Sequence, residues 1–221
     1  MAAIARPIAL LALFAAVLAQ PAAAQQQIET GGAYVHGPAH AVYPLRVGDF
    51  RRADIYQYDS AGEDVSASYN LATPEGRLLI TVYIYPAPAV SSPGSGAAEA
   101  RAQACDQEFE NVKAAISTQH DQAAPIEQGE ALAVPGVKAG LSHRSVYRFR
   151  TPFDDRVQEI RSEAHLYCYV GGDWLVKYRV SAPAAVETRG PVESFIRNGP
   201  WPGRNAADTV LRPAPADSAP G

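Results

Sequence analysis

The sequence predicts an α+β domain: an antiparallel sheet of about six strands, one long helix packed on a face of the sheet, and a short C-terminal helix. Three observations support this fold class. Side chains alternate in character through residues 77–86, as in a strand with two different faces. Apolar side chains recur every three or four residues through 97–118, as on one side of a helix. Turn-forming residues separate the other apolar runs.

Residues 1–24 have the layout of a secretory signal peptide. A basic start at Arg6 precedes an apolar run over residues 8–18, and small alanines precede Gln25. The apolar run is short for a bilayer span, so we expect cleavage before Gln25 and a periplasmic or secreted protein. An uncleaved N-terminal anchor is the alternative. We expect no integral membrane segment after cleavage, because no second long apolar run follows.

The rest of the chain suits one domain of ordinary size. Residues 25–48 are predicted as an irregular lead-in, 49–202 as a single α+β domain, and 203–221 as a disordered tail. The net charge is −4, and loss of Arg6 with the signal peptide leaves about −5. This mild acidity argues against a nucleic-acid partner, which would favour a strongly basic face.

The first half of the domain is predicted as a three-stranded meander. Strands over 50–58 and 64–70 are joined by the turn-rich DSAGE, and a loop containing Pro74 and Gly76 leads into the strand 77–86. One face of this last strand is aliphatic and the other carries Tyr83 and Tyr85. Pairing Tyr69 with Leu78 keeps the aliphatic face continuous across the meander.

The long helix is predicted over 97–118, after a flexible connector at 86–96. We expect its apolar stripe to pack on the aliphatic face of strand 77–86. The stripe consists of Ala98, Ala102, Cys105, Phe109, Val112 and Ile116.

Three further strands are predicted over 138–150, 157–170 and 174–181, followed by a short helix over 191–198. In the first hairpin, pairing Phe149 with Gln158 sets arginines opposite glutamates on the outer face. For the second turn, a two-residue loop would place Leu166 beside Lys177 and bury that lysine. A three-residue loop at 171–173 aligns Cys168 with Val176 instead, and we prefer it for that reason.

Cys105 and Cys168 are the two cysteines, and in an exported chain they are predicted to form a disulfide. Both point towards the core in the predicted helix and strand. The bridge would close a loop of roughly 60 residues, worth about 4 kcal/mol in the chain-entropy treatment. Two separate buried thiols are the alternative.

The sequence contains no recognisable catalytic or cofactor motif, so we predict no catalytic residues, no cofactor and no metal site. His36 and His40 form a His-x3-His pair, which can bind zinc or copper when a helix aligns it. Gly37 and Pro38 argue against a helix there, and no further ligands accompany the pair.

An aromatic and basic surface is the candidate binding site. In the preferred register, alternate residues of the last hairpin point outward, on a side that the tyrosines of strand 77–86 can share. Such a surface could recognise an anionic ligand or a partner protein; the alternative is an ordinary solvated sheet face. The candidate residues are Tyr83, Tyr85, His165, Tyr167, Lys177 and Arg179.

The order of elements resembles that of the PsbP-like extrinsic photosystem proteins and their exported bacterial relatives. The resemblance covers about residues 47–201 and includes the long helix, the strand GGDWLVKYRVSAP and the closing helix VESFIRN. It implies an α/β sandwich that serves as a non-catalytic accessory or assembly factor, and it identifies no functional residues.

We therefore expect a non-enzymatic accessory or binding protein of the cell envelope, whose partner is an envelope protein or a small ligand. A hydrolase-like periplasmic enzyme is one alternative, because catalytic groups can converge from distant strands. A protein that binds a small ligand in an apolar cavity under the long helix is another.

Overall fold

The computed structural model describes residues 25–91, 94, 96–120 and 123–204. The predicted signal peptide, and the predicted tail from residue 205 onward, lie outside the described residues. Within them, nine strands form one antiparallel sheet with the order β1-β5-β6-β7-β11-β10-β9-β8, and β4 also pairs with β5. The strands of this sheet are β1 (Gln26–Gln27), β4 (Arg46–Val47), β5 (Phe50–Gln57), β6 (Val65–Thr73), β7 (Gly76–Pro86), β8 (Pro125–Gly129), β9 (Ser142–Phe153), β10 (Arg156–Val170) and β11 (Trp174–Pro183).

The prediction of an α+β domain with about six strands is wrong, because the sheet has nine strands and dominates the fold. The six predicted strands correspond to β5, β6, β7, β9, β10 and β11. The other three strands, β1, β4 and β8, span only two to five residues each. The predicted lead-in also contains a separate two-stranded hairpin, formed by β2 (Tyr34–His36) and β3 (Ala41–Tyr43).

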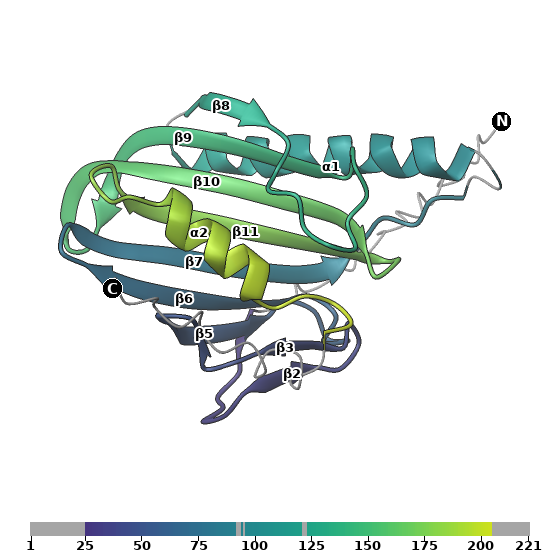
Figure 1. The fold of residues 1–221 in the computed structure, drawn as a ribbon, viewed down its shortest axis with the longest axis horizontal. Helices are drawn as coiled ribbons and strands as arrows, with labels where there is room; N and C mark the ends of the chain where they lie inside the picture. Colours follow the sequence, from purple (N-terminus) through teal and green to yellow (C-terminus); the bar gives the residue numbers. More distant parts are fainter. Residues whose placement is uncertain (1–24, 92–93, 95, 121–122, 205–221) are drawn as a thin grey trace, which may run out of the picture.

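Two helices cover opposite faces of the sheet (Figure 1): α1 (Gly96–Gln119) and α2 (Arg189–Asn198). They lie where the sequence predicts helices. Among the described residues, neither helix combines the length and apolar character needed to cross a membrane.

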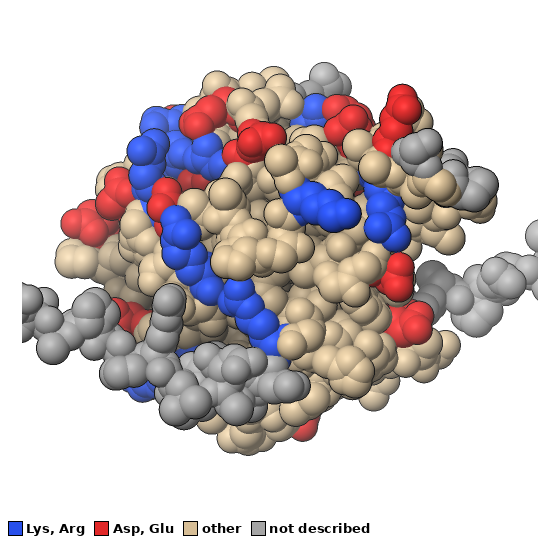
Figure 2. All heavy atoms as spheres, turned by 45° about the vertical axis from the view of Figure 1, so that its right-hand side comes forward, with Lys and Arg blue, Asp and Glu red and all other residues tan. Residues whose placement is uncertain are grey.

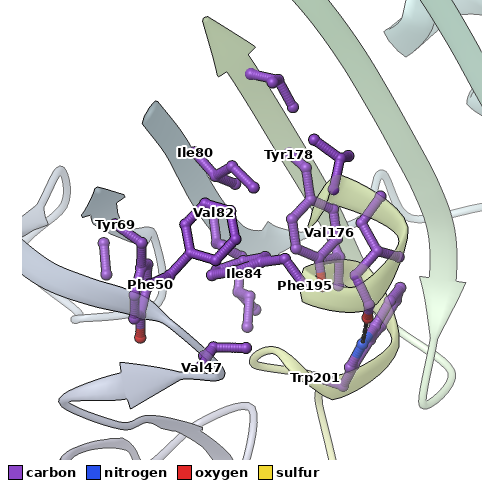
Figure 3. Packing of buried hydrophobic residues seen from close by; sticks show 14 of the residues in the cluster. Val47, Phe50, Tyr69, Ile80, Val82, Ile84, Val176, Tyr178, Phe195 and Trp201 are labelled. Carbon is purple, nitrogen blue, oxygen red and sulfur yellow. Dashed lines mark hydrogen bonds between the residues drawn. The ribbon is translucent and has the colours of Figure 1, made fainter. Parts of the chain in front are cut away.

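The aliphatic face of β7 packs beneath α2 and the β2–β3 hairpin, in one buried cluster. Phe195 of α2 points into this cluster (Figure 3), with its ring 4.9 Å from that of Phe50 and 5.0 Å from that of Tyr69. Trp201 closes the end of the cluster and donates its indole N–H to the carbonyl of Ile196 at 2.7 Å. Residues that were predicted as irregular therefore supply part of the main core.

Helix α1 packs on the other face of the sheet. Its buried residues contact β9, β10 and the start of β11 in a second cluster that includes Leu166 and Leu175. The prediction that α1 covers the aliphatic face of β7 is therefore wrong, because α2 and the hairpin already occupy that face. The predicted disulfide is confirmed: Cys105 of α1 is bonded to Cys168 of β10, with Cα atoms 5.8 Å apart.

Two hairpins are paired two residues away from the predicted register. Tyr69 lies opposite Ile80, and Phe149 lies opposite Ile160. Both turns are tighter than expected; in the second, Asp154 and Asp155 take positive φ angles of 51° and 59°, as a two-residue type I′ turn requires. A shift of two residues keeps every side chain on its predicted face.

The hairpin of β10 and β11 combines both alternatives that the sequence offers. Val170 pairs with Trp174 across the predicted three-residue loop. A β-bulge then shifts the register, so that Leu166 pairs with Lys177, and within the bulge Tyr169 has a φ angle of 55°. The predicted loop length is right and the predicted pairing of Cys168 with Val176 is wrong, because the bulge inserts one residue.

Candidate functional site

The candidate surface residues divide between the two faces of the sheet. Tyr83 and Tyr85 of β7 and Lys177 and Arg179 of β11 lie on the α1 face, where Lys177 is directly opposite Tyr83. The predicted surface also includes His165 and Tyr167, but these lie on the α2 face. The bulge in β10 is the reason, because it changes which residues of the two strands share a face.

Two cavities follow the α1 face of β7 and β11, with volumes of about 260 and 270 Å³. Because Tyr83 and Lys177 line both, we call the two cavities together the groove. The first cavity is also lined by Tyr58, Asp64, Tyr85 and Glu108. The second is also lined by Thr81, Val112, Ala115, Gln119, Arg179 and Ser181.

Lys177 lies at the junction of the two cavities. Its Nζ atom is 4.3 Å from the centre of the Tyr83 ring and 5.3 Å from that of Tyr85, so it makes cation–π contacts with both. No carboxylate among the described residues lies within ion-pair distance of it. Burial, and then repulsion from Arg179, lower the pKa of the Lys177 ammonium.

Arg179 is the second cation of the groove. Its Nη2 donates to the hydroxyl of Ser162 at 3.4 Å, and its buried Nε has no hydrogen-bond partner among the described residues. Burial lowers the pKa of the guanidinium. The cavity of about 270 Å³ is therefore lined by two cations and three hydroxyl-bearing side chains, with no carboxylate. This is the composition of an anion-binding site.

The other cavity has an acidic end. The Tyr85 hydroxyl donates to Oε1 of Glu108 at 2.8 Å, and burial raises the pKa of Asp64. Burial also raises the pKa of Tyr83 to about 12, so this hydroxyl remains protonated at neutral pH. The groove thus runs from acidic groups through a phenol to two adjacent cations.

Replacing Lys177 with methionine should raise the free energy of unfolding at pH 7 by about 1 kcal/mol, because the variant no longer holds a half-buried ammonium group that burial and Arg179 disfavour. The folded protein holds this proton less tightly than the unfolded chain. Wild-type stability should therefore rise with pH between the lowered pKa and the ordinary value of 10.5, and the advantage of Lys177→Met should shrink there. Urea denaturation at several pH values measures both effects. The exposed Lys138→Met serves as control, and a less stable Lys177→Met would contradict the prediction.

The α2 face carries a different cluster, centred on the buried Glu163. Burial alone would raise the pKa of this carboxyl group, but hydrogen bonds from His165 and Arg161 and the charge of Arg144 hold it well below its usual range. Arg161 Nε is 2.8 Å from Oε1 and Arg144 Nη2 is 3.0 Å from Oε2. The hydroxyl of Thr188, just before α2, donates to Oε1 at 3.0 Å. The cluster therefore ties α2 to β9 and β10.

His165 also faces a cavity of about 230 Å³ beside this cluster. Its Nε2 is 3.2 Å from Oε2 of Glu163, an arrangement that can orient a general base. No Ser, Thr or Cys is among the residues that line this cavity, and the nearby Thr188 hydroxyl is already donated to Glu163. Tyr167 is part of the main buried cluster, and its hydroxyl donates a hydrogen bond to the carbonyl oxygen of Leu132 at 3.1 Å.

Sequence reasoning missed several residues of the groove. Gln119 lies at the end of α1, whereas Thr81, Asp64 and Ser181 lie on or beside strands; no local pattern connects them. Alternation in β7 could have pointed to Thr81, which shares a face with Tyr83.

His36 is fully buried, with its ring 5.5 Å from that of Trp174 and its Nε2 2.8 Å from the carbonyl oxygen of Gly62.

Comparison with known proteins gives no further information. No protein-family model matches the chain, and no curated protein or solved structure matches it. The resemblance to PsbP-like proteins therefore stays a prediction.

Proposed function

We propose that this protein is an exported, non-enzymatic binding protein of the cell envelope, and that its groove takes a small anionic ligand. One observation carries the proposal: Lys177 and Arg179 line the same cavity, whose other lining residues contribute no carboxylate. Partly buried cations without an ion-pair partner are unfavourable for the free protein. An anionic ligand would supply the missing partner, with additional hydrogen bonds from the hydroxyl groups.

The proposed ligand is small rather than polymeric. A cavity of about 270 Å³ is smaller than the sites of about 300–1,000 Å³ that enclose drug-sized molecules. Figure 2 shows one side of the molecule, on which a row of basic side chains runs from the upper left to the lower centre and acidic side chains lie mostly toward the edges. Export is supported by the signal-like residues 1–24 and by the disulfide. An accessory role in the envelope is what the PsbP-like resemblance implies.

Replacing Arg179 with glutamine should weaken the binding of a small carboxylate about tenfold or more, since a charge-assisted hydrogen bond contributes about 1.5–3 kcal/mol. Isothermal titration calorimetry with pyruvate and lactate measures the effect on the purified mature protein. Arg51→Gln is the matched control, because Arg51 is an exposed arginine of the same sheet. The proposal fails if neither anion binds the wild-type protein, or if both variants bind as the wild type does.

A further inference from the structure

Lys177 differs from the other two lysines of the chain, Lys113 and Lys138. Lys113 is ion-paired with Glu110 at 2.7 Å, and Lys138 is exposed. The Lys177 amine instead lies between two tyrosine rings, beside Arg179, and faces both cavities of the groove. It is therefore half-buried, reachable by a ligand and without an ion-pair partner among the described residues.

These surroundings are the ones that make a lysine nucleophilic. An amine attacks a carbonyl carbon only through its neutral form, and lysines reach that form near neutral pH when they are desolvated or lie beside another cation. Both conditions hold for Lys177, and together they lower its pKa in spite of the opposing charges of Glu108 and Asp64. A larger fraction of this amine is then unprotonated at pH 7 than in an exposed lysine.

Arg179 and Lys177 are also spaced to hold the two functional groups of one small molecule. They are two residues apart on β11 and point to the same face, so their Cα atoms lie about 7 Å apart. Two long side chains with this spacing can converge on a ligand of a few carbon atoms. A carboxylate held at Arg179 would present a neighbouring carbonyl group to Lys177.

We propose that Lys177 forms a reversible imine with a small 2-oxo acid whose carboxylate is bound by Arg179. This inference rests on the proposed anion site and names its ligand class. The amine nitrogen bonds to the carbonyl carbon, and the carbonyl electron pair moves to oxygen, which takes up a proton. The nitrogen gives up its two protons in turn: the first replaces the proton delivered to the oxygen, and the second goes to the hydroxyl group as the C=N bond forms and the C–O bond breaks, so that the oxygen leaves as water. Tyr83, a protonated phenol that lines both cavities, is the nearby proton donor.

Reductive trapping tests the imine directly. Wild-type protein is incubated with pyruvate and cyanoborohydride and examined by intact-mass and peptide mass spectrometry. We expect one reduced adduct, on Lys177, formed at least tenfold faster than any adduct on Lys113 or Lys138. Lactate, which has a hydroxyl group in place of the carbonyl, should give no adduct and should slow the trapping of pyruvate by competing for the groove.

Lys177→Arg separates the imine from the anion site, because arginine keeps the positive charge and cannot form the imine. This variant should still bind lactate and should give no adduct; Arg179→Gln should slow trapping about tenfold. Equal labelling of all three lysines, or equal binding of pyruvate and lactate without an adduct, overturns the imine and leaves the anion site intact. Failure of the wild-type protein to bind either acid refutes the proposed function itself.

Discussion

Replacing Glu163 with glutamine should lower the free energy of unfolding at pH 7 by about 3 kcal/mol, the lower end of the range for breaking a buried ion pair. The carboxylate is only 3% exposed and accepts hydrogen bonds from Arg144, Arg161 and Thr188. A neutral amide would leave the two arginines with Glu127, whose side chain is about half exposed, as their remaining charged partner. The –NH₂ group of the glutamine would also face these donor groups, where the wild-type carboxylate has an oxygen that accepts their hydrogen bonds.

The pH dependence of this loss has a definite sign. The folded state holds the pKa of Glu163 well below the usual value of 4.5, so the carboxylate stabilises the fold above that value. This contribution is lost as the pH falls below about 4.5 and through the folded pKa. The difference between wild type and Glu163→Gln should therefore be largest near neutral pH and should shrink in acid.

Urea denaturation of both proteins from pH 3 to pH 7 measures the effect, with Glu159→Gln as control. Glu159 lies on the same strand and pairs with Arg148 at 3.4 Å, but both side chains are about half exposed. An exposed pair of this kind contributes at most about 1 kcal/mol. Equal losses in the two variants would show that the buried network contributes no more than a surface pair.

The alternation of side chains in β7 and the apolar period of α1 were enough to predict both elements, since each pattern reflects burial along one element. The same patterns do not say which helix covers which face. Both helices have an apolar side that could pack on the sheet. Contacts with α2 and with the β2–β3 hairpin decide which helix covers the aliphatic face of β7. The hairpin was missed because its strands have only three residues each, too few for a periodic signal.

Lys177 explains why the candidate site was predicted only in part. The preferred register was chosen to keep this lysine out of a buried layer, which is the correct preference for an ordinary lysine. The structure places it on the α1 face all the same, half-buried beside Tyr83, Tyr85 and Arg179. Local rules tend to fail at functional positions. The failure at Lys177 therefore adds to the reasons for assigning the groove a function.

Removing the disulfide should have the largest effect on stability. A Cys105→Ala/Cys168→Ala double variant should be less stable by about 4 kcal/mol, because the bridge spans 63 residues and its absence restores the freedom of that loop in the unfolded chain. Urea denaturation measures the loss. A reducing agent should destabilise the wild type by a similar amount and leave the variant unchanged; a variant as stable as the oxidised wild type would contradict the prediction.

The same variant should also weaken the groove. Its second cavity has one wall from α1, including Val112 and Ala115, and the other from β7 and β11. The bridge joins α1 to β10, next to β11 in the sheet. Without it, ligand binding must also order the helix against the sheet, so the affinity for pyruvate should fall severalfold. Calorimetry below the unfolding transition measures this fall, and an unchanged affinity would mean that apolar packing alone positions α1.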